Sequence, residues 1–155
     1  MADTLSSDER SRNMAAIRSR DTKPEMYLRK LLFSRGYRYR IAEKSIPGHP
    51  DIFLRKYNTA IFIHGCFWHR HPGCEYAYTP KTRVAFWQKK FDDNVRRDAI
   101  VAEELQSLGT KQLIIWECTI KQMKRSVVFE AQVLSRIESI IKSNYDEKSL
   151  IKISL

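Results

Sequence analysis

The sequence predicts an α/β fold in which helices flank a central mixed β-sheet. Two short apolar runs rich in β-branched residues, at 59–63 and 112–116, have the pattern of buried strands. Segments with helical periodicity lie before, between and after these runs. A dense cluster of histidines, cysteines and aromatic residues follows the first run directly. We expect this loop to carry the chemistry, because α/β enzymes commonly place their sites at the ends of strands.

The composition limits the number of domains and the class of partner. With 155 residues the chain is long enough for one well-cored domain and too short for two typical ones. We expect a single domain over residues 21–155, preceded by a flexible basic arm over residues 1–20. Lys and Arg number 28 against 18 Asp and Glu, a net charge of +10, which favours nucleic acid as the partner.

The sequence contains neither a secretory signal nor an apolar run long enough to cross a bilayer. We therefore expect a soluble, cytoplasmic protein with no membrane partner.

The first segments are a basic stretch and a helix. Residues 10–20 contain four arginines and no acidic residue, which fits either an arm that orders on a duplex or a short surface helix that caps the domain. Thr22 then has the character of a helix N-cap, and Glu25 stands at the position that closes a capping box. An apolar stripe follows, and Gly36 is a typical stop.

Three strands are predicted next. Residues 37–41 alternate rings and arginines, which indicates an edge strand. After a turn at 45–50, the runs 51–54 and 59–63 form a predicted β-hairpin. Asp51 thus begins one strand beside the loop that leaves the other.

The second half of the chain is mainly helical. We predict one helix from Thr79 to about Lys90, another from about Asp92 to Leu108, and a last amphipathic helix from about Val127 to Lys142. The strand at 112–116 lies between the second and the third. The tail beyond these elements has no informative pattern.

The three cysteines of the chain indicate a structural zinc site. Cys66 and Cys74 lie on the loop after the first strand run, and Cys118 follows the second. With His71 they supply the four thiolate and imidazole ligands that a closed zinc site requires. Buried apolar cysteines beside a solvated histidine are the alternative. A disulfide is disfavoured, because the cysteine count is odd and a cytosol keeps thiols reduced.

Several short motifs stand out across roughly residues 10–118: Arg12-Asn13-Met14, Arg20-Asp21-Thr22, Pro47-Gly48-His49-Pro50-Asp51, His64-Gly65-Cys66-Phe67-Trp68-His69, Phe86-Trp87, Asn94-Val95, Arg97-Asp98 and Trp116-Glu117-Cys118. Together they resemble the very short patch repair endonucleases of bacteria. The order of elements also resembles the restriction-endonuclease-like PD-(D/E)xK core.

The resemblance implies a Mg²⁺-dependent, strand-specific nick on the 5′ side of the thymine in a T·G mismatch, left when 5-methylcytosine deaminates. It implies double-stranded DNA as the partner and allows for a mismatch-repair accessory protein. Because the lesion is asymmetric, one copy of the chain is enough, and we expect a monomer.

The resemblance places the catalytic centre at Asp51 and His69. Asp51 would hold Mg²⁺, a hard cation that prefers carboxylate oxygens, and the backbone carbonyl of Ile63 would complete the coordination. The second acid and the lysine of the wider nuclease class would fall near Phe62 and His64, and neither residue is acidic. The resemblance therefore implies His69 as the general base, since histidine titrates near neutrality. From the residues alone, a further histidine beside the zinc site or a hydrogen-bond donor to phosphate is the alternative.

Three further residues have both a catalytic and a structural interpretation. His64 would contact a phosphate or the leaving group, or else be a hydrogen-bonded structural histidine. Glu25 and Asp98 would support metal-bound waters and orient the base. For Glu25 the capping box is the alternative, and for Asp98 it is an ion pair with Arg96 or Arg97.

The aromatic residues of the loop match a mismatch-binding wedge in the resembling family. Phe67, Trp68 and Trp87 would insert beside the mismatch from the major groove, where a poorly stacked wobble pair makes insertion less costly. Core packing is the alternative, and it is our assignment for Trp116. The basic arm would clamp the minor groove through Arg12, Met14 and Arg20.

Two other functions fit the same residues. A zinc-stabilised DNA-binding module without catalysis would use Asp51, His69 and Glu25 structurally. A restriction-type endonuclease would cut matched duplex with the same fold and metal. An acid and a histidine that converge on one strand end favour the mismatch endonuclease.

Overall fold

The computed structural model describes residues 6–16, 20–143 and 150–153. Within them lies one four-stranded sheet, whose strands follow each other in the order β1 (Ile52–Leu54), β2 (Thr59–His64), β3 (Lys111–Trp116) and β4 (Leu150–Ile153). β1 is antiparallel to β2, and the other neighbours are parallel. The predicted mixed sheet is therefore confirmed.

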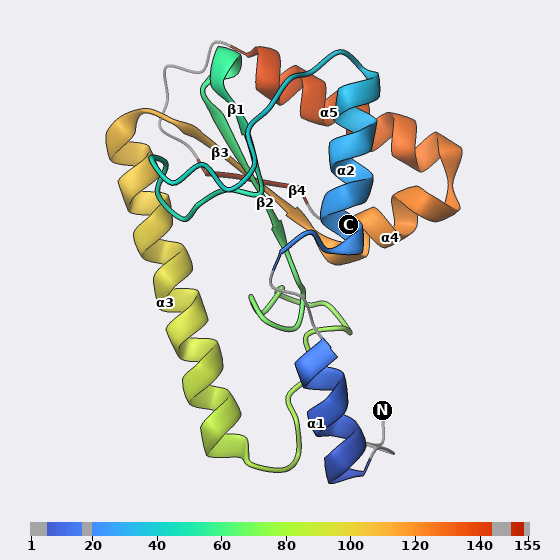
Figure 1. Cartoon of the computed structure of the whole chain (residues 1–155), viewed down its shortest axis with the longest axis vertical. Coiled ribbons are helices and arrows are strands. Elements are labelled where there is room, and N and C mark those ends of the chain that lie inside the picture. The colour runs from blue at the N-terminus through green and yellow to red at the C-terminus, as the bar shows by residue number, and fades with distance from the viewer. Residues whose placement is uncertain (1–5, 17–19, 144–149, 154–155) are drawn as a thin grey trace.

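Helices cover both faces of the sheet (Figure 1). A long helix, α3 (Val84–Leu108), lies along one face. The other face is covered by three helices, α2 (Lys23–Ser34), α4 (Glu117–Arg125) and α5 (Val127–Lys142). The last of these begins and ends where the sequence predicts, and its N-cap Ser126 accepts a hydrogen bond from the Phe129 N–H.

The two layers follow from the alternation of side chains along each strand. Ile61 of β2 is fully buried among residues of α2, α4 and α5. Its neighbours Ala60 and Phe62 face the other way and pack with Leu105 of α3. Because both faces are covered, the inner strands are continuously apolar over residues 60–63 and 113–116, and their polar residues stand at the strand ends.

The hairpin and the parallel pair bring three chain segments to one edge of the sheet. β1 pairs with β2 from Leu54 opposite Thr59 to Ile52 opposite Ile61, as the hairpin prediction requires. β2 and β3 are parallel and end side by side, with His64 opposite Trp116. The loop after β2 and the start of α4 therefore meet at the same edge.

Two predictions about the helices that follow β2 are wrong. The structure has one helix, α3, where two were expected, and this helix begins at Val84 rather than at Thr79. No Pro or Gly interrupts residues 84–108, and Phe91, at the expected break, is only 2% exposed and packs inside the helix–loop interface. Arg83, in the left-handed region at φ 53°, precedes the first turn.

The predicted edge strand at 37–41 is also wrong. In its place the structure has a single bridge between Arg40 and Phe53, so the backbone of the segment pairs with the sheet at one point only, although Tyr37 packs into the core. Three elements were not predicted at all: the short 3-10 helix η1 (Arg55–Tyr57), α4, which follows β3 without a turn, and β4, which pairs in parallel with β3.

The N-terminal stretch contains α1 (Ser7–Ala16), which lies apart from the sheet in Figure 1. A capping box starts it, since the Ser6 hydroxyl accepts from the Glu9 N–H and the Glu9 carboxylate accepts from the Ser6 N–H. A helix is thus present at residues 7–16, but it lies apart from the sheet rather than capping it, and the flexible arm that orders on a duplex stays a prediction. Among the described helices, none is both long and apolar enough to cross a membrane.

Candidate active site and metal centre

Asp51 and the end of β2 form the acidic part of the site. Asp51 directly precedes β1, and its carboxylate accepts a 2.7 Å hydrogen bond from the Ile63 N–H across the hairpin. Burial raises the pKa of Asp51 to about 6; the Ile63 N–H opposes this shift, and the neighbouring Glu25 carboxylate adds to it. A cation beside Asp51 would stabilise its charged form, which burial and Glu25 disfavour.

Glu25 lies on the first turn of α2 and is 5% exposed. Its N–H donates to the Thr22 hydroxyl at 3.5 Å, so the threonine half of the predicted capping box is present. Its carboxylate accepts a 3.1 Å bond from the guanidinium of Arg29, one turn along the helix. Glu25 can therefore have both roles. Its backbone N–H takes part in the helix cap, and its side chain is free of the cap and lies near Asp51.

Two histidines and an aspartate make up the second part of the site. His64 is the last residue of β2, and its ring stacks on that of His69 at a centroid distance of 3.8 Å and an interplanar angle of 9°. The Nδ1 atom of His69 lies 2.6 Å from a carboxylate oxygen of Asp98 on α3. Since a carboxylate only accepts, Nδ1 carries the proton and the other ring nitrogen is left as the basic atom.

The structure does not show the ion pair of Asp98 with Arg96 or Arg97 that was the alternative to a catalytic role. Asp98 pairs with His69 rather than with Arg96 or Arg97, and Arg96 lies 3.9 Å from Asp93 instead. A cleft of about 410 Å³ opens beside the pair, between α3 and the ends of the inner strands. Its lining includes His64, His69, Asp98 and Trp116.

Asp51 and His69 lie in the same site. Ile63, which binds the Asp51 carboxylate, is followed at once by His64, and His64 stacks on His69. While burial raises the pKa of Asp51, the charges of Arg29 and His69 are near enough to oppose that effect. The two side chains therefore lie near the same end of β2, while their joint role in hydrolysis stays a prediction.

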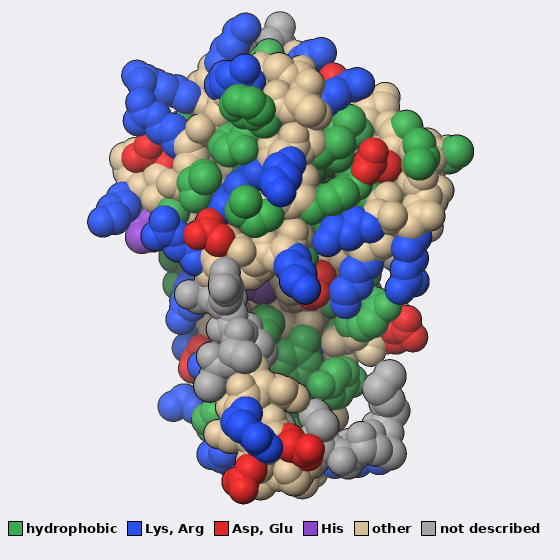
Figure 2. Space-filling view, turned by 45° about the vertical axis from the view of Figure 1, so that its right-hand side comes forward, with side chains coloured by type: hydrophobic (Ala, Val, Ile, Leu, Met, Phe, Trp, Pro, Cys, Tyr) green, Lys and Arg blue, Asp and Glu red, His purple; other side chains and the backbone are tan. Residues whose placement is uncertain are grey.

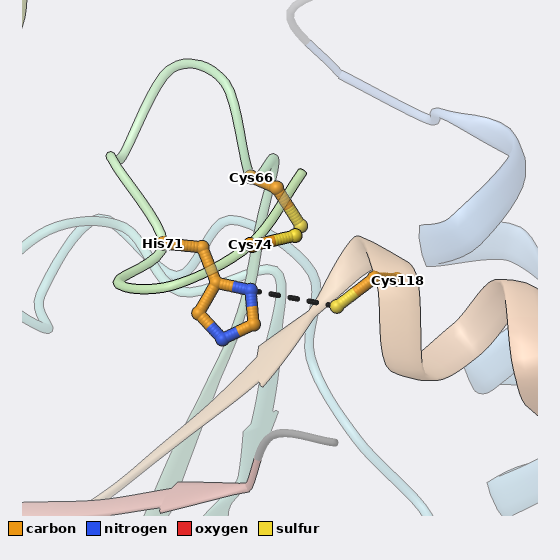
Figure 3. Close-up of side chains that lie close together, drawn as sticks. All are labelled: Cys66, His71, Cys74 and Cys118. Atoms are coloured by element: carbon orange, nitrogen blue, oxygen red, sulfur yellow. Dashed lines mark hydrogen bonds between the residues drawn. The ribbon is translucent and has the colours of Figure 1, made fainter. Parts of the chain in front are cut away.

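The four predicted zinc ligands converge on one point (Figure 3). Cys66, His71 and Cys74 come from the loop after β2, and Cys118 comes from the first turn of α4. Their ligand atoms all lie within 4.8 Å of one another, and the Cys118 sulfur is 3.4 Å from Nδ1 of His71. Tetrahedral zinc would require separations of roughly 3.5–3.8 Å, so the arrangement fits the ion.

The chemistry of these four side chains also fits a metal. Burial raises the pKa of Cys66 to about 12 and that of Cys118 in the same direction, so both thiols stay protonated unless a cation stabilises the thiolates. Burial lowers the pKa of His71, which favours the neutral imidazole that metals bind. The His71 ring is held in place by stacking on Trp116 at 4.2 Å.

Trp116 is a core residue, as predicted, with 4% of its surface exposed. The wedge candidates form a separate ring cluster on the loop and α3. Phe67 is at its centre, with ring centroids 5.1 Å from Trp68 and 5.4 Å from Trp87. Buried Phe91 supports the cluster from below at 5.1 Å from Phe67. All three candidates are half-buried, so they combine core packing with an exposed edge.

The basic residues of the N-terminal stretch lie on the surface. Arg12 on α1 and Arg20 beyond it are exposed, whereas the side chain of Met14 is outside the described residues. In Figure 2, Lys and Arg side chains are far more frequent than Asp and Glu on the face shown, and hydrophobic side chains are exposed in the recess between α1 and the body of the protein.

The sequence of the chain is similar to those of known DNA endonucleases. A family model described as DNA mismatch endonuclease Vsr matches residues 2–76. The chain is 44% identical over 121 residues to the DNA mismatch endonuclease Vsr of Escherichia coli, an alignment that covers 78% of this chain and 77% of that protein. The chain belongs to the Vsr family of DNA mismatch endonucleases.

Other Vsr-family relatives are named as nicking enzymes. The type II nicking enzyme V.NmeAIP of Neisseria meningitidis is 44% identical over 121 residues, which is 78% of this chain and 86% of that protein. The type II nicking enzyme V.XorIIP of Xanthomonas oryzae is 38% identical over 123 residues, 79% of this chain and 90% of that protein. Membership in the Vsr family makes the protein a DNA endonuclease, a hydrolase that acts in DNA repair, and confirms the predicted enzyme class.

Sequence reasoning missed Arg29, which the structure places among the acids of this Vsr-family site. Arg29 is 3% exposed and donates to side chains of Asp21 and Glu25 and to the backbone carbonyl of Asp51. A signal was present, because Glu25 and Arg29 stand four residues apart on one helix face. Such pairs are usually on the surface, and nothing in the sequence marks this one as buried.

Proposed function

We propose that this Vsr-family endonuclease requires Mg²⁺ and nicks one strand of duplex DNA on the 5′ side of the thymine in a T·G mismatch. The observation that carries the proposal is the convergence of Asp51 and the His69–Asp98 pair at one edge of the sheet, together with the half-buried ring cluster on the same loop. The proposed reaction has three requirements: an acid that binds the metal, a base that activates water, and aromatic rings that insert beside the poorly stacked mismatch.

The metal proposal rests on the acidic part of the site. Asp51 and the Ile63 carbonyl would hold Mg²⁺, and the Glu25 carboxylate would bind water in its coordination sphere. The bound ion would polarise the scissile phosphate. Two carboxylates stand near each other here, close enough for Glu25 to affect the pKa of Asp51, which burial alone already raises. Such a pair suits a hard cation.

The base proposal rests on the His69–Asp98 hydrogen bond. Asp98 holds the proton on Nδ1, so the other nitrogen of His69 can take a proton from the attacking water. His64 stacks on His69 and would contact the phosphate or the leaving oxygen. Water would then add to phosphorus as the bond to the 3′ oxygen breaks. His69 would take the proton of the attacking water, and the departing 3′ oxygen would take up a proton from solvent.

The DNA proposal rests on the rings and the arm. Phe67, Trp68 and Trp87 would enter from the major groove, and residues 1–20 would act as a basic arm in the minor groove, with Arg12, Met14 and Arg20 as contacts. Residues 21–155 would then be the endonuclease domain. The antiparallel hairpin with Asp51 at its start supports a PD-(D/E)xK core for it. Zn²⁺ would brace the loop that carries the rings.

One nicking assay tests this function. Labelled duplexes that carry T·G, T·A or C·G at a single position are incubated with Mg²⁺ or with EDTA. We expect one strand of the T·G duplex to be cut, and only with Mg²⁺. Cleavage of the matched duplexes would point to a restriction-type enzyme instead. Binding without cleavage of any duplex would contradict the proposal.

A further inference from the structure

Arg29 is a buried cation at the junction of three chain segments. It lies on α2, with 3% of its surface exposed. One terminal nitrogen of its guanidinium donates to the Asp21 carboxylate at 2.7 Å. The other donates to the Glu25 carboxylate at 3.1 Å and to the Asp51 carbonyl at 3.4 Å. Arg29 thereby joins the entry to α2, its first turn and the start of β1.

The position of Arg29 is itself fixed. Its backbone carbonyl accepts a 3.1 Å bond from the Tyr39 hydroxyl, and the bridge at Arg40 joins that neighbouring segment to β1. The Nε atom of Arg29 is buried and has no partner among the described residues. A planar guanidinium held at its base can present its terminal nitrogens to several acceptors in one geometry, which the single ammonium of lysine cannot do.

Stability alone is a poor explanation for this arrangement. Removing an arginine from water costs several kcal/mol, and a buried ion pair is often no more stable than apolar side chains of similar size. The protein nevertheless buries Arg29 next to Glu25 and Asp51, the two acids that we assign to the metal and its water. Hydrogen bonds to Glu25 and to the peptide of Asp51 fix the distance between those acids, and catalytic groups lose rate when that distance changes by even 1 Å.

We propose that Arg29 is a positioning residue of the endonuclease: it sets the separation of Glu25 and Asp51 and couples that geometry, through Asp21, to the basic arm. The inference rests on the proposed function. Asp21 suits the coupling role, since its side chain is half exposed, its backbone is in the left-handed region at φ 53°, and it directly follows Arg20. Arg29 touches neither DNA nor metal in this scheme and acts through the acids.

The test compares Arg29→Lys with the parent protein in single-turnover nicking of the T·G duplex at saturating protein and Mg²⁺. Lysine retains the positive charge but lacks the planar guanidinium, whose two terminal nitrogens donate to different acceptors. We expect the rate constant to fall at least about tenfold while the fraction of active protein and the affinity for the duplex stay unchanged. The matched control is Arg35→Lys, at the end of the same helix, where the 2.8 Å ion pair with Glu138 is at the surface. It should leave the rate constant unchanged.

A merely structural role predicts the opposite pattern. Misfolded Arg29→Lys protein would lower the active fraction, while the folded remainder would nick at the parent rate, and this result would overturn the proposal. If Arg29→Lys does not fold, Asp21→Asn decides, because asparagine tolerates the left-handed backbone. Its rate constant should fall about threefold at full active fraction, and an unchanged rate constant would overturn the proposal.

Binding of Mn²⁺ alone, followed by electron paramagnetic resonance without DNA, separates this inference from the proposed function. We expect Arg29→Lys to bind Mn²⁺ at least about threefold more weakly than the parent, because the acids are no longer held together. If the parent fails to nick T·G, the proposed function is wrong, and the Mn²⁺ comparison alone then decides the role of Arg29. Equal Mn²⁺ affinities in that case would overturn it.

Discussion

The carboxylate of Asp51 accepts a 2.7 Å hydrogen bond from the backbone N–H of Ile63. This bond crosses from the start of β1 to the end of β2 and favours the charged form of the acid. Burial is the larger effect and, with the neighbouring Glu25, raises the pKa of Asp51 to about 6. The protein thus holds in place an acid that is costly to ionise, and a bound divalent cation would offset that cost.

The raised pKa of Asp51 predicts a pH-dependent stability. The folded protein binds this proton more tightly than the unfolded chain, so the contribution is present below about pH 4 and is lost as the pH rises through about 6. A shift from 3.8 to about 6 corresponds to about 3 kcal/mol. Asp51→Asn cannot ionise, so urea unfolding should show it gaining stability over the parent by an amount of this order between pH 4 and 7.

Exposed Asp93→Asn is the matched control for that measurement and should follow the parent at every pH. Saturating Mg²⁺ at pH 7 should stabilise the parent but not Asp51→Asn, because only the carboxylate is a good ligand. An Asp51→Asn protein whose stability parallels that of the parent across this pH range would contradict the buried-acid description.

The His69–Asp98 pair predicts a graded loss of nicking. His69→Ala removes the proposed base and should lower the single-turnover rate about 10²- to 10⁴-fold, with the affinity for T·G duplex retained. Asp98→Asn keeps the imidazole but no longer fixes its proton on Nδ1, so its rate should lie between those of the parent and His69→Ala. Asp93→Asn again serves as the control. A His69→Ala rate within tenfold of the parent would remove His69 from the role of base.

The parts of the fold that sequence predicted are those with strong local signals. The runs at 59–63 and 112–116 are β-branched and buried on both faces, and the last helix has a serine N-cap and a clear apolar stripe. The edge strand at 37–41 failed although its alternation is regular, because an alternating pattern also suits a segment that touches the sheet at one bridge. β4 depends on a non-local pairing with β3 that a four-residue run does not reveal.

The candidate site divides in the same way. The sequence predicts Asp51, His69 and the zinc ligands together, because the antiparallel hairpin brings the start of β1 to the end of β2 and the parallel pair brings the segments after β2 and β3 to the same edge. The stacking of His64 on His69 and the bonds of Arg29 depend on the path of a loop and on the packing of α2 against β1. The four-residue spacing of Glu25 and Arg29 is visible in the sequence, but the burial of Arg29 and the stacking of His64 are not predicted by residue types or spacing.

The zinc assignment predicts that Cys118→Ala lowers stability and metal content together. Cys118 joins α4 to the loop after β2, so an open site would release that loop from the sheet. We expect the loss of at least about 3 kcal/mol, or roughly 10 °C in Tm, measured by calorimetry alongside zinc content by atomic emission. A strong chelator should destabilise the parent and leave Cys118→Ala unaffected. Equal Tm and metal content in the two proteins would contradict the assignment.

The ring cluster predicts a loss of mismatch recognition that is independent of charge. Trp87 contacts Phe67 and Trp68 while keeping an exposed edge, so Trp87→Ala should weaken binding to T·G duplex by about 1–3 kcal/mol and bring it closer to T·A. Because no charge is lost, the slope of log affinity against log salt should not change, whereas Arg12→Ala should reduce it by about one. Phe33→Ala, an exposed ring on α2, is the control. A Trp87→Ala protein that weakens T·G and T·A binding equally would show that this ring supports the loop without reading the mismatch.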